Sequence, residues 1–292
     1  MIEAICETVK AELRKSTDSG RTVFSDTVFG FAVNAPSELF ETMYEPALCL
    51  ILQGAKQTVI DGRTLDLRAG DSILISHHVP VHARITEASS EKPYIALIIR
   101  IDMKIVRGLH AQIKHLGEHG EKAFSVSASQ AEQALLGVIH RMLGILQNPV
   151  DAALLADSVH QEMHLRLLQA PHAAMLRELA TADSGASAIS RAIDFVRKNY
   201  SQTLPVSAIA REAGMSESSF HQKFRKITGA TPLQYVKSLR LSEARNLLLL
   251  DDCSVSSAAF TVGYESANQF SRDYSKRFGH PPSEARVQTL YA

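Results

Sequence analysis

A group of histidines in the first third of the chain has side chains that can bind a metal ion or hydrogen-bond a ligand. Three of them fall within residues 77–82, near the end of one apolar segment. Zinc and iron sites place their histidines at characteristic spacings, and this cluster fits none of them. We therefore expect no metal and no cofactor, and interpret the cluster as contacts to a small molecule. The candidate residues are Glu45, His77, His78, His82 and Arg84.

A second pair of histidines, His160 and His164, lies four residues apart, which places both on one face of a helix. Zinc peptidases with this spacing carry a glutamate after the first histidine, whereas this chain has Gln161. We interpret both as ordinary surface histidines. The sequence also lacks a Ser-His-Asp order, a phosphate-binding loop and a glycine-rich dinucleotide fingerprint, so we expect that the protein is not an enzyme.

Polar side chains of another kind occur in two segments of similar pattern. GMSESSFHQKFRKITG spans residues 214–229, and GYESANQFSRDYSKRFG spans residues 263–279. In both, aromatic residues recur at helical spacing, while amides, lysines and arginines face the other way. Glutamine and asparagine can pair with adenine, arginine can pair with guanine, and distal basic residues suit phosphates. The phosphate candidates are Lys223, Arg225, Lys226, Lys276 and Arg277.

The elements around these segments predict two helix-turn-helix motifs. A short helix precedes Gly214 in the first copy and Gly263 in the second, and a second helix follows each glycine. The second helix of such a motif enters the DNA major groove. The segment between the copies, PLQYVKSLRLSEARNLLLL, predicts a helix of roughly 18 residues and about 27 Å. That length suits two motifs in major grooves that lie about 34 Å apart.

Charge is unevenly distributed along the chain. The 292 residues hold 31 basic and 31 acidic side chains, but residues 186–292 hold 14 basic and only 9 acidic ones. This excess favours a nucleic-acid partner for the C-terminal part. No window of 18 or more residues is purely apolar, and the N-terminus does not resemble a signal peptide. We therefore expect a cytoplasmic protein without a membrane segment.

The first half of the chain alternates short apolar runs with turn residues. About eight strands are expected over residues 21–101, including a hairpin at Asp61-Gly62, and Cys49 is expected in the core of one of them. Beyond Asp102 the pattern is helical to the end. Two long amphipathic helices in this part can either cover the β domain or form a dimer seam, and both interpretations stay open.

The repeated segments resemble the DNA-binding domain of the AraC/XylS family of bacterial transcription regulators. The likeness rests on F-x-x-x-F-(K/R)-x-x-x-G-x-x-P in the first copy and on GYES with Phe270, Arg272 and Tyr274 in the second. It implies asymmetric promoter DNA and RNA polymerase as partners, with activation or repression as the outcome. The chain departs from the family pattern at Ala267 and at the extra Pro281. The positions that the resemblance matches to base contacts are Ser218, His221, Gln222, Asn268, Ser271 and Arg272.

The strand-rich part is similar to the cupin-like N-terminal domain of AraC-type regulators, through LILQGAK, the AGDS turn, TEAS and YIALIIRID. This resemblance implies a small-molecule effector and a homodimer. Cupin enzymes hold their metal through two histidines one residue apart, and the matching stretch after Gly54 contains no histidine. The alternative hypotheses are a cupin metalloenzyme fused to a DNA-binding domain and a DNA-binding protein without an effector.

The expected fold is therefore α+β. An N-terminal cupin-like β-barrel with flanking helices is followed by an all-α domain with two helix-turn-helix motifs joined by a long helix. We expect the effector-binding and dimerisation domain over residues 1–180, with its barrel near 21–101 and its helices near 103–170. A linker is expected at 181–188 and the DNA-binding domain at 186–292.

Overall fold

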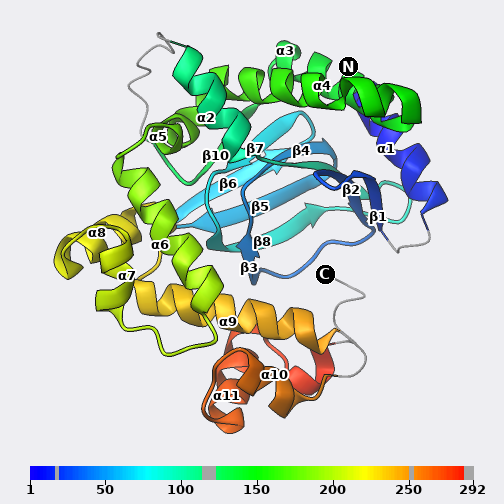
Figure 1. The fold of residues 1–292 in the computed structure, drawn as a ribbon. Coiled ribbons are helices and arrows are strands. Elements are labelled where there is room, and N and C mark those ends of the chain that lie inside the picture. The colour runs from blue at the N-terminus through cyan, green and yellow to red at the C-terminus, as the bar shows by residue number, and fades with distance from the viewer. Residues whose placement is uncertain (17–19, 114–122, 250–252, 286–292) are drawn as a thin grey trace.

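The computed structural model describes residues 1–16, 20–113, 123–249 and 253–285. Two antiparallel sheets pack face to face in the first half of the chain, and the second half is helical (Figure 1). This confirms the α+β expectation. The two sheets form a cupin-like jelly roll that remains open at its edges, not a closed barrel.

The larger sheet has the strand order β1-β2-β9-β4-β7-β10, and the smaller has β3-β8-β5-β6. Apolar side chains from both sheets, among them Ile51, Ile73 and Val81, form the core between them. Cys49 belongs to this core and is 6% exposed, as expected from its apolar strand. The strands are β1 Arg21–Ser25, β2 Val28–Val33, β3 Phe40–Tyr44, β4 Ala47–Gln53, β5 Ala55–Ile60, β6 Arg63–Arg68, β7 Asp71–Ile75, β8 Val79–Glu87, β9 Tyr94–Arg100 and β10 Val126–Gln130.

The predicted Asp61-Gly62 hairpin joins β5 to β6. Ile60 pairs with Arg63, and both loop residues have positive φ, 48° for Asp61 and 71° for Gly62. A two-residue loop with this backbone matches the twist of its flanking strands, which explains why Asp-Gly is favoured there. The tip of the hairpin reaches the helical half, since a Cβ built on Gly229 would lie 3.4 Å from the Asp61 Cβ.

One strand interrupts the helical pattern expected beyond Asp102. β10 pairs with β7 from Val126 opposite Ile75 to Gln130 opposite Asp71, at the edge of the larger sheet. Its sequence, VSASQ, buries only Val126 fully and carries little periodic signal. The expectation of continuous helix is wrong here because pairing with a distant strand sets the conformation of this short segment.

The helices follow the predicted order, with additions. They are α1 Ile2–Lys15, α2 Met103–Gln112, α3 Gln133–Gln147, α4 Pro149–Gln169, α5 Ala174–Ala180, α6 Gly185–Asn199, α7 Val206–Glu212, α8 Glu217–Thr228, α9 Pro232–Leu248, α10 Val255–Thr261 and α11 Ala267–Phe278, with short 3₁₀ turns η1 Pro171–Ala173 and η2 Pro282–Glu284. Within the described ranges, none of these helices is both long and apolar enough to cross a membrane.

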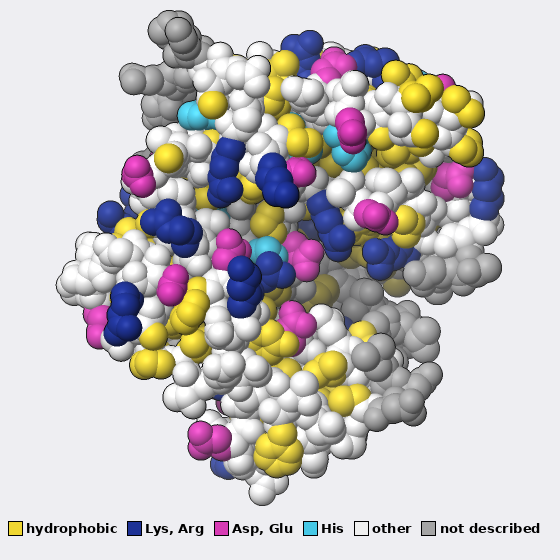
Figure 2. Space-filling view, viewed as in Figure 1, with side chains coloured by type: hydrophobic (Ala, Val, Ile, Leu, Met, Phe, Trp, Pro, Cys, Tyr) yellow, Lys and Arg dark blue, Asp and Glu magenta, His cyan; other side chains and the backbone are white. Residues whose placement is uncertain are grey.

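Helices α3 and α4 cover the outer face of the larger sheet (Figure 1). Their inner residues share one core with Leu48, Leu50 and Leu97 of the sheet, so the covering role left open by the sequence is observed. α4 also turns apolar side chains outward, because Val150 is 66% exposed and Leu154 is 74% exposed. Figure 2 shows hydrophobic side chains gathered at the upper right, over the region where α3 ends and α4 begins.

The C-terminal helices surround two separate cores that share the long helix α9. Its first half contributes Val236 and Leu239 to a core with α6, α7 and α8, and its second half contributes Leu241 and Ala244 to a core with α10 and α11. The predicted spacer helix is therefore present, with 17 residues. The expected linker is helical from Gly185 onward, so only residues 181–184 precede α6.

Candidate nucleic-acid interface

Helix α8 presents the first set of predicted base contacts. Phe220 and Phe224 are fully buried beneath it, with ring centroids 5.1 Å apart. Gly229 ends the helix at a φ of 72°, a conformation that glycine adopts without the strain of a Cβ atom. Because the aromatic face is fixed in the core, the opposite face is exposed. The predicted base contacts on it are Ser218, His221 and Gln222.

Helix α11 packs in the same way in the second motif, with two buried aromatic residues and a glycine at its end. Phe270 and Tyr274 are fully buried, with ring centroids 5.5 Å apart, and Gly279 ends the helix at a φ of 78°. The Ser266 hydroxyl oxygen accepts the backbone N–H of Gln269 at 3.3 Å and so caps the first turn. The two helices therefore share a packing frame while their outward residues differ, and we call α8 and α11 the reading helices.

The predicted base contacts of α11 are not equally available. Asn268 and Arg272 are exposed, whereas Ser271 is half-buried. The Ser271 hydroxyl donates a hydrogen bond to the Ala267 carbonyl oxygen at 2.9 Å. Its proton is thus used within the helix, and only its lone pairs remain to accept a hydrogen bond from a base.

The predicted phosphate contacts are also not equally exposed. Lys223, Arg225, Lys226 and Lys276 are exposed in the C-terminal halves of the reading helices. The Arg277 side chain is only 4% exposed, and its Nη1 lies 3.3 Å from a carboxylate oxygen of a residue on β3, Glu41.

The ion pair between Arg277 and Glu41 joins the two halves of the chain at close range, but its atoms are not placed to form a hydrogen bond. None of the three guanidinium nitrogens of Arg277 has a hydrogen-bond partner within the described residues. Burial lowers the pKa of Arg277, the Glu41 carboxylate opposes this shift, and the charge of Arg245 adds to it. Arg277 is therefore a desolvated cation beside one carboxylate, and in this arrangement its guanidinium is not exposed for a phosphate contact.

Three further contacts dock α9 on the smaller sheet. The Tyr235 hydroxyl donates to the His78 carbonyl oxygen at 2.8 Å, and the Ser238 hydroxyl donates to a Glu41 carboxylate oxygen at 2.9 Å. Met43, two residues along β3 from Glu41, packs against the core of the first motif. We call this set, with Arg277, the docking contact. It holds the second reading helix by its C-terminal end.

The structure does not bring the predicted effector contacts together. His82 and Arg84 are exposed on β8, where Arg84 Nε donates to the Gln57 side chain at 3.1 Å. Glu45 pairs with Arg100 on the surface at 3.7 Å. His77 and His78 instead line a cavity of about 480 Å³ between the end of the jelly roll, α2 and α6.

Both histidines of this cavity are neutral at pH 7. Burial lowers the pKa of His77 to about 4, and the nearby backbone of Ala186 opposes the shift. The residue is only 2% exposed. His77 Nδ1 lies 2.9 Å from the Ser76 hydroxyl, and its Nε2 has no hydrogen-bond partner in the described chain. Burial, followed by the charges of Arg197 and His77, lowers the pKa of His78 to about 3.

The interpretation of His164 as a surface residue is wrong. It is 1% exposed, and its Nε2 accepts the backbone N–H of Asp102 at 2.9 Å, while Nδ1 bonds the His160 carbonyl oxygen at 2.7 Å. Nδ1 therefore carries the proton and donates it within α4, while Nε2 joins α4 to the start of α2. Among the residues that the structure describes, no group of three or more His, Cys, Asp or Glu side chains could hold a metal ion.

Sequence reasoning missed the acidic partner of Arg277. Glu41 lies in FETMY, a strand with no buried residue and no charge pattern of its own, and it is 197 positions from Ser238. One signal was available: counted back from Gly229 and Gly279, which end the two helices, Arg277 stands where the first copy has Ile227. A charged residue at this half-buried position needs an acidic neighbour in the fold.

Comparison with known proteins places this architecture in a family. Residues 26–175, just over half of the chain, match the model of the AraC-type transcriptional regulator N-terminus, and residues 209–288 match a helix-turn-helix domain. The chain belongs to the AraC-type transcriptional regulators. The resemblance noted in the repeated segments and in the strand-rich part is thereby confirmed.

AraC-type relatives match different shares of the chain. The virulence regulon transcriptional activator VirF of Yersinia enterocolitica is 33% identical over 96 residues, which are 33% of this chain and 35% of VirF. The transcriptional activator RhaS of Pectobacterium atrosepticum is 26% identical over 177 residues, 60% of this chain and 61% of RhaS. The chain thus spans less than two thirds of the length of these curated relatives.

A solved structure shares the whole fold of this AraC-type chain. It is ToxT of Vibrio cholerae with a bound unsaturated fatty acid, and it covers 93% of this chain and 96% of its own with a TM-score of 0.62. The sequence identity is 13%, so the match shows a common fold and nothing more.

Proposed function

We propose that this protein is a sequence-specific DNA-binding transcription regulator, responsive to a small molecule, and not an enzyme. The observation that carries the proposal is the pair of reading helices. They share one packing frame, with Phe220 and Phe224 matched by Phe270 and Tyr274, yet they expose different polar side chains. Such a pair suits one asymmetric site in two successive major grooves.

In this proposal the two helices have complementary tasks. Ser218, His221 and Gln222 of α8 contact one set of base edges, and Asn268 and Arg272 of α11 contact another. Lys223, Arg225, Lys226 and Lys276 bind the flanking phosphates and contribute affinity without sequence preference. Since the named relatives VirF and RhaS are activators, we propose that the protein activates transcription and contacts RNA polymerase.

We further infer that an effector acts on the docking contact. A ligand can change DNA binding only if it has different affinity for the docked and undocked arrangements of the two halves. The cavity lined by His77 and His78 lies between the jelly roll and α6, where a ligand touches both halves at once. The fatty acid in the ToxT structure is a precedent for a small ligand on this fold.

We propose a cytoplasmic homodimer that is joined through α4. Val150, Leu154 and Leu155 expose an apolar stripe on this helix, and such a stripe is stable in water when a second copy covers it. The two DNA-binding halves then occupy two copies of the asymmetric site.

Selection of DNA from a random duplex pool tests the proposal. We expect the purified protein to enrich an asymmetric sequence with two blocks of preferred bases. The Gln222→Ala variant should lose preference in one block, and the Arg272→Ala variant should lose it in the other. Lys198→Ala, which changes an exposed basic residue outside the reading helices, is the matched control. Failure to enrich any sequence, or loss of both blocks in every variant, would contradict the proposal.

A further inference from the structure

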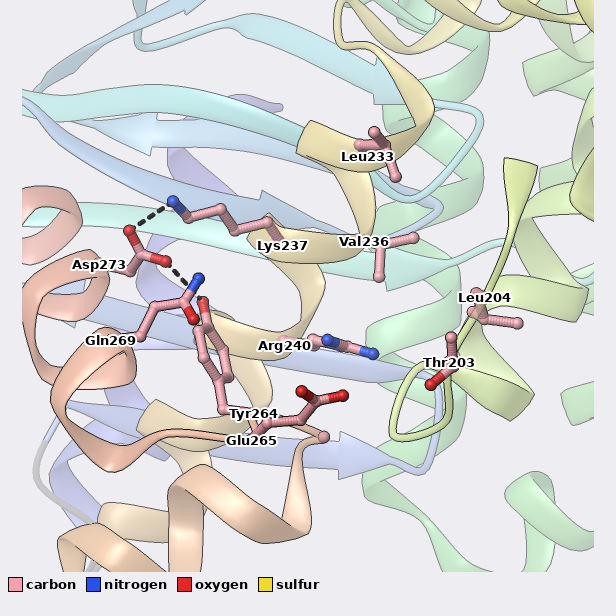
Figure 3. Close-up of a pocket in the computed structure, with 11 residues that line it drawn as sticks. Thr203, Leu204, Leu233, Val236, Lys237, Arg240, Tyr264, Glu265, Gln269 and Asp273 are labelled. Atoms are coloured by element: carbon pink, nitrogen blue, oxygen red, sulfur yellow. Dashed lines mark hydrogen bonds and ion pairs between the residues drawn. The ribbon is translucent and has the colours of Figure 1, made fainter.

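A cleft of about 350 Å³ lies where the two helix-turn-helix units meet (Figure 3). It is bounded by three segments: the loop before the first motif at residues 200–204, the spacer helix α9, and the turn and reading helix of the second motif. We call the contacts among these segments the inter-motif junction.

Asp273 of α11 joins two of these segments. Lys237 Nζ of α9 lies 2.5 Å from one of its carboxylate oxygens, and the Tyr264 hydroxyl donates to the other at 3.4 Å (Figure 3). The Asp273 side chain is 19% exposed and Tyr264 is 8% exposed. Burial, followed by the charge of Asp273, raises the pKa of Tyr264, so the phenol keeps its proton and remains a donor. Both oxygens of Asp273 are therefore engaged by groups outside its own helix.

The backbone closes the junction on its other side. Gly263, in the turn of the second motif, has a φ of 88°, and a Cβ on it would lie 2.3 Å from the Ser201 carbonyl oxygen. Arg240 of α9 holds the same loop, since its Nε donates to the Tyr200 carbonyl oxygen at 2.7 Å and its Nη2 donates to that of Gln202 at 2.8 Å. The turn of the second motif thus rests directly on the chain that leads into the first.

The apolar cores contribute little to the angle between the motifs. The core of the first motif and the core of the second are separate clusters, and Tyr200 is a partly buried residue that packs against both. Apart from α9, the packing of Tyr200 and the docking contact, the described contacts that join one motif to the other are the polar contacts of the junction.

A small change of the angle between the motifs moves the end of α11 by a distance close to the spacing of DNA base pairs. Helix α11 has 12 residues. At 1.5 Å per residue it is about 18 Å long, so a rotation of about 10° moves its far end by about 3 Å. This displacement is close to the rise of one base pair, about 3.4 Å. Arg272, a predicted base contact, directly precedes the anchored Asp273.

We propose that Asp273 is a positioning residue for DNA recognition. Its contact with Lys237 sets the angle of α11 on α9, and this angle determines the spacing between the two blocks of bases that one subunit accepts. The inference rests on the proposed DNA-binding function, and it assigns the choice of spacing to residues that do not touch bases.

Fluorescence anisotropy with defined duplexes tests it. The probes are the selected DNA, the same DNA with one base pair added or removed between the two blocks, and a duplex with only the α8 block. We expect the full-length protein to lose about tenfold in affinity for each altered spacing, the usual scale of one misplaced contact. Asp273→Asn should bind the duplex with the selected spacing about five- to tenfold more weakly than the unaltered protein does. Its affinities for the three spacings should lie within about twofold of one another, and its affinity for the duplex with only the α8 block should be unchanged.

A charge exchange and a matched control make the result specific. The Lys237→Asp, Asp273→Lys double variant should regain the spacing preference. Glu265→Gln removes a carboxylate that lines the same cleft but forms no hydrogen bond or close ion pair in the described chain, and it should leave the preference unchanged. Equal weakening of Asp273→Asn at every spacing, or no rescue by the exchange, would overturn the inference. If the unaltered protein shows no sequence-specific binding, the proposed function fails as well.

Discussion

Removing the charge of Glu41 should release the second reading helix and strengthen DNA binding. In the Glu41→Gln variant the amide oxygen can still accept the Ser238 hydroxyl, so the change removes mainly the attraction to Arg277. Arg277 is then a buried cation without a counter-charge in the docked arrangement. Undocking returns it to water, where it is solvated and free to meet a phosphate.

The size of the effect follows from burial. Breaking a fully buried ion pair costs about 3–5 kcal/mol. Here Arg277 is 4% exposed and Glu41 is 22% exposed, with a 3.3 Å contact that has no hydrogen-bond geometry. We therefore expect the docked arrangement to lose about 1–2 kcal/mol. If that arrangement dominates in the free protein, the apparent DNA affinity rises about 5- to 30-fold.

Anisotropy titrations of the full-length protein with the selected duplex measure this change. Glu38→Gln is the matched control, because Glu38 is an exposed acid on the same segment without an ion pair among the described residues. A thermal melt checks that both variants remain folded. Equal affinity of Glu41→Gln and the unaltered protein, or weaker binding with an unchanged melt, would refute the docking argument.

Four other outcomes are expected. Arg272→Ala should cost about 1–3 kcal/mol on the selected duplex and relax the choice of one base, and equal loss on random DNA would contradict its role. Lys276→Ala should reduce the slope of log affinity against log salt by about one unit with little change in preference, which titrations at several salt concentrations measure. His77 and His172, the second of which lies in η1 and is 7% exposed, have pKa values lowered by burial to about 4 from the ordinary 6.5, so the unfolded chain binds protons first as the pH falls. The free energy of unfolding that these histidines contribute is therefore fully present above pH 6.5 and is lost as the pH falls from 6.5 to about 4. The loss is about 1.4 kcal/mol per unit of pKa difference for each histidine. Urea titrations measure it, and a free energy of unfolding that does not change over this pH range would contradict the prediction. Leu154→Lys should convert the dimer to a monomer in sedimentation velocity, and an unchanged sedimentation coefficient would place the dimer contact elsewhere.

Local chemistry explains which parts of the fold were predictable. The Asp61-Gly62 hairpin requires two residues with positive φ, and that requirement is visible in the dipeptide itself. Both reading helices bury aromatic residues at helical spacing, and the spacer helix buries mainly aliphatic residues at helical spacing, so the same kind of periodic pattern located all three. The contacts between distant segments left no such pattern.

In the candidate site too, the features set within one helix were predictable, and those set by contacts between distant segments were not. The exposed positions of α8 followed from the buried positions of Phe220 and Phe224, because a helix with one face in the core presents the other to solvent. The confinement of Arg277 did not follow, since it depends on how β3 meets α11. His164 was misjudged for a similar reason, because its partner is the backbone N–H of Asp102, which precedes another helix, α2.

Strand β3 has a further consequence through the order in which the chain is made. It offers Glu41 and Met43 on one side, and these residues meet α9, α11 and the core of the first motif. A ribosome completes the N-terminal half before the C-terminal half emerges, and domains generally fold as units during synthesis. The jelly roll is therefore in place as a template when α9 and α11 appear. We expect each new molecule to be delivered in the docked arrangement, so that it starts with the weaker DNA affinity and needs no separate step to reach that state.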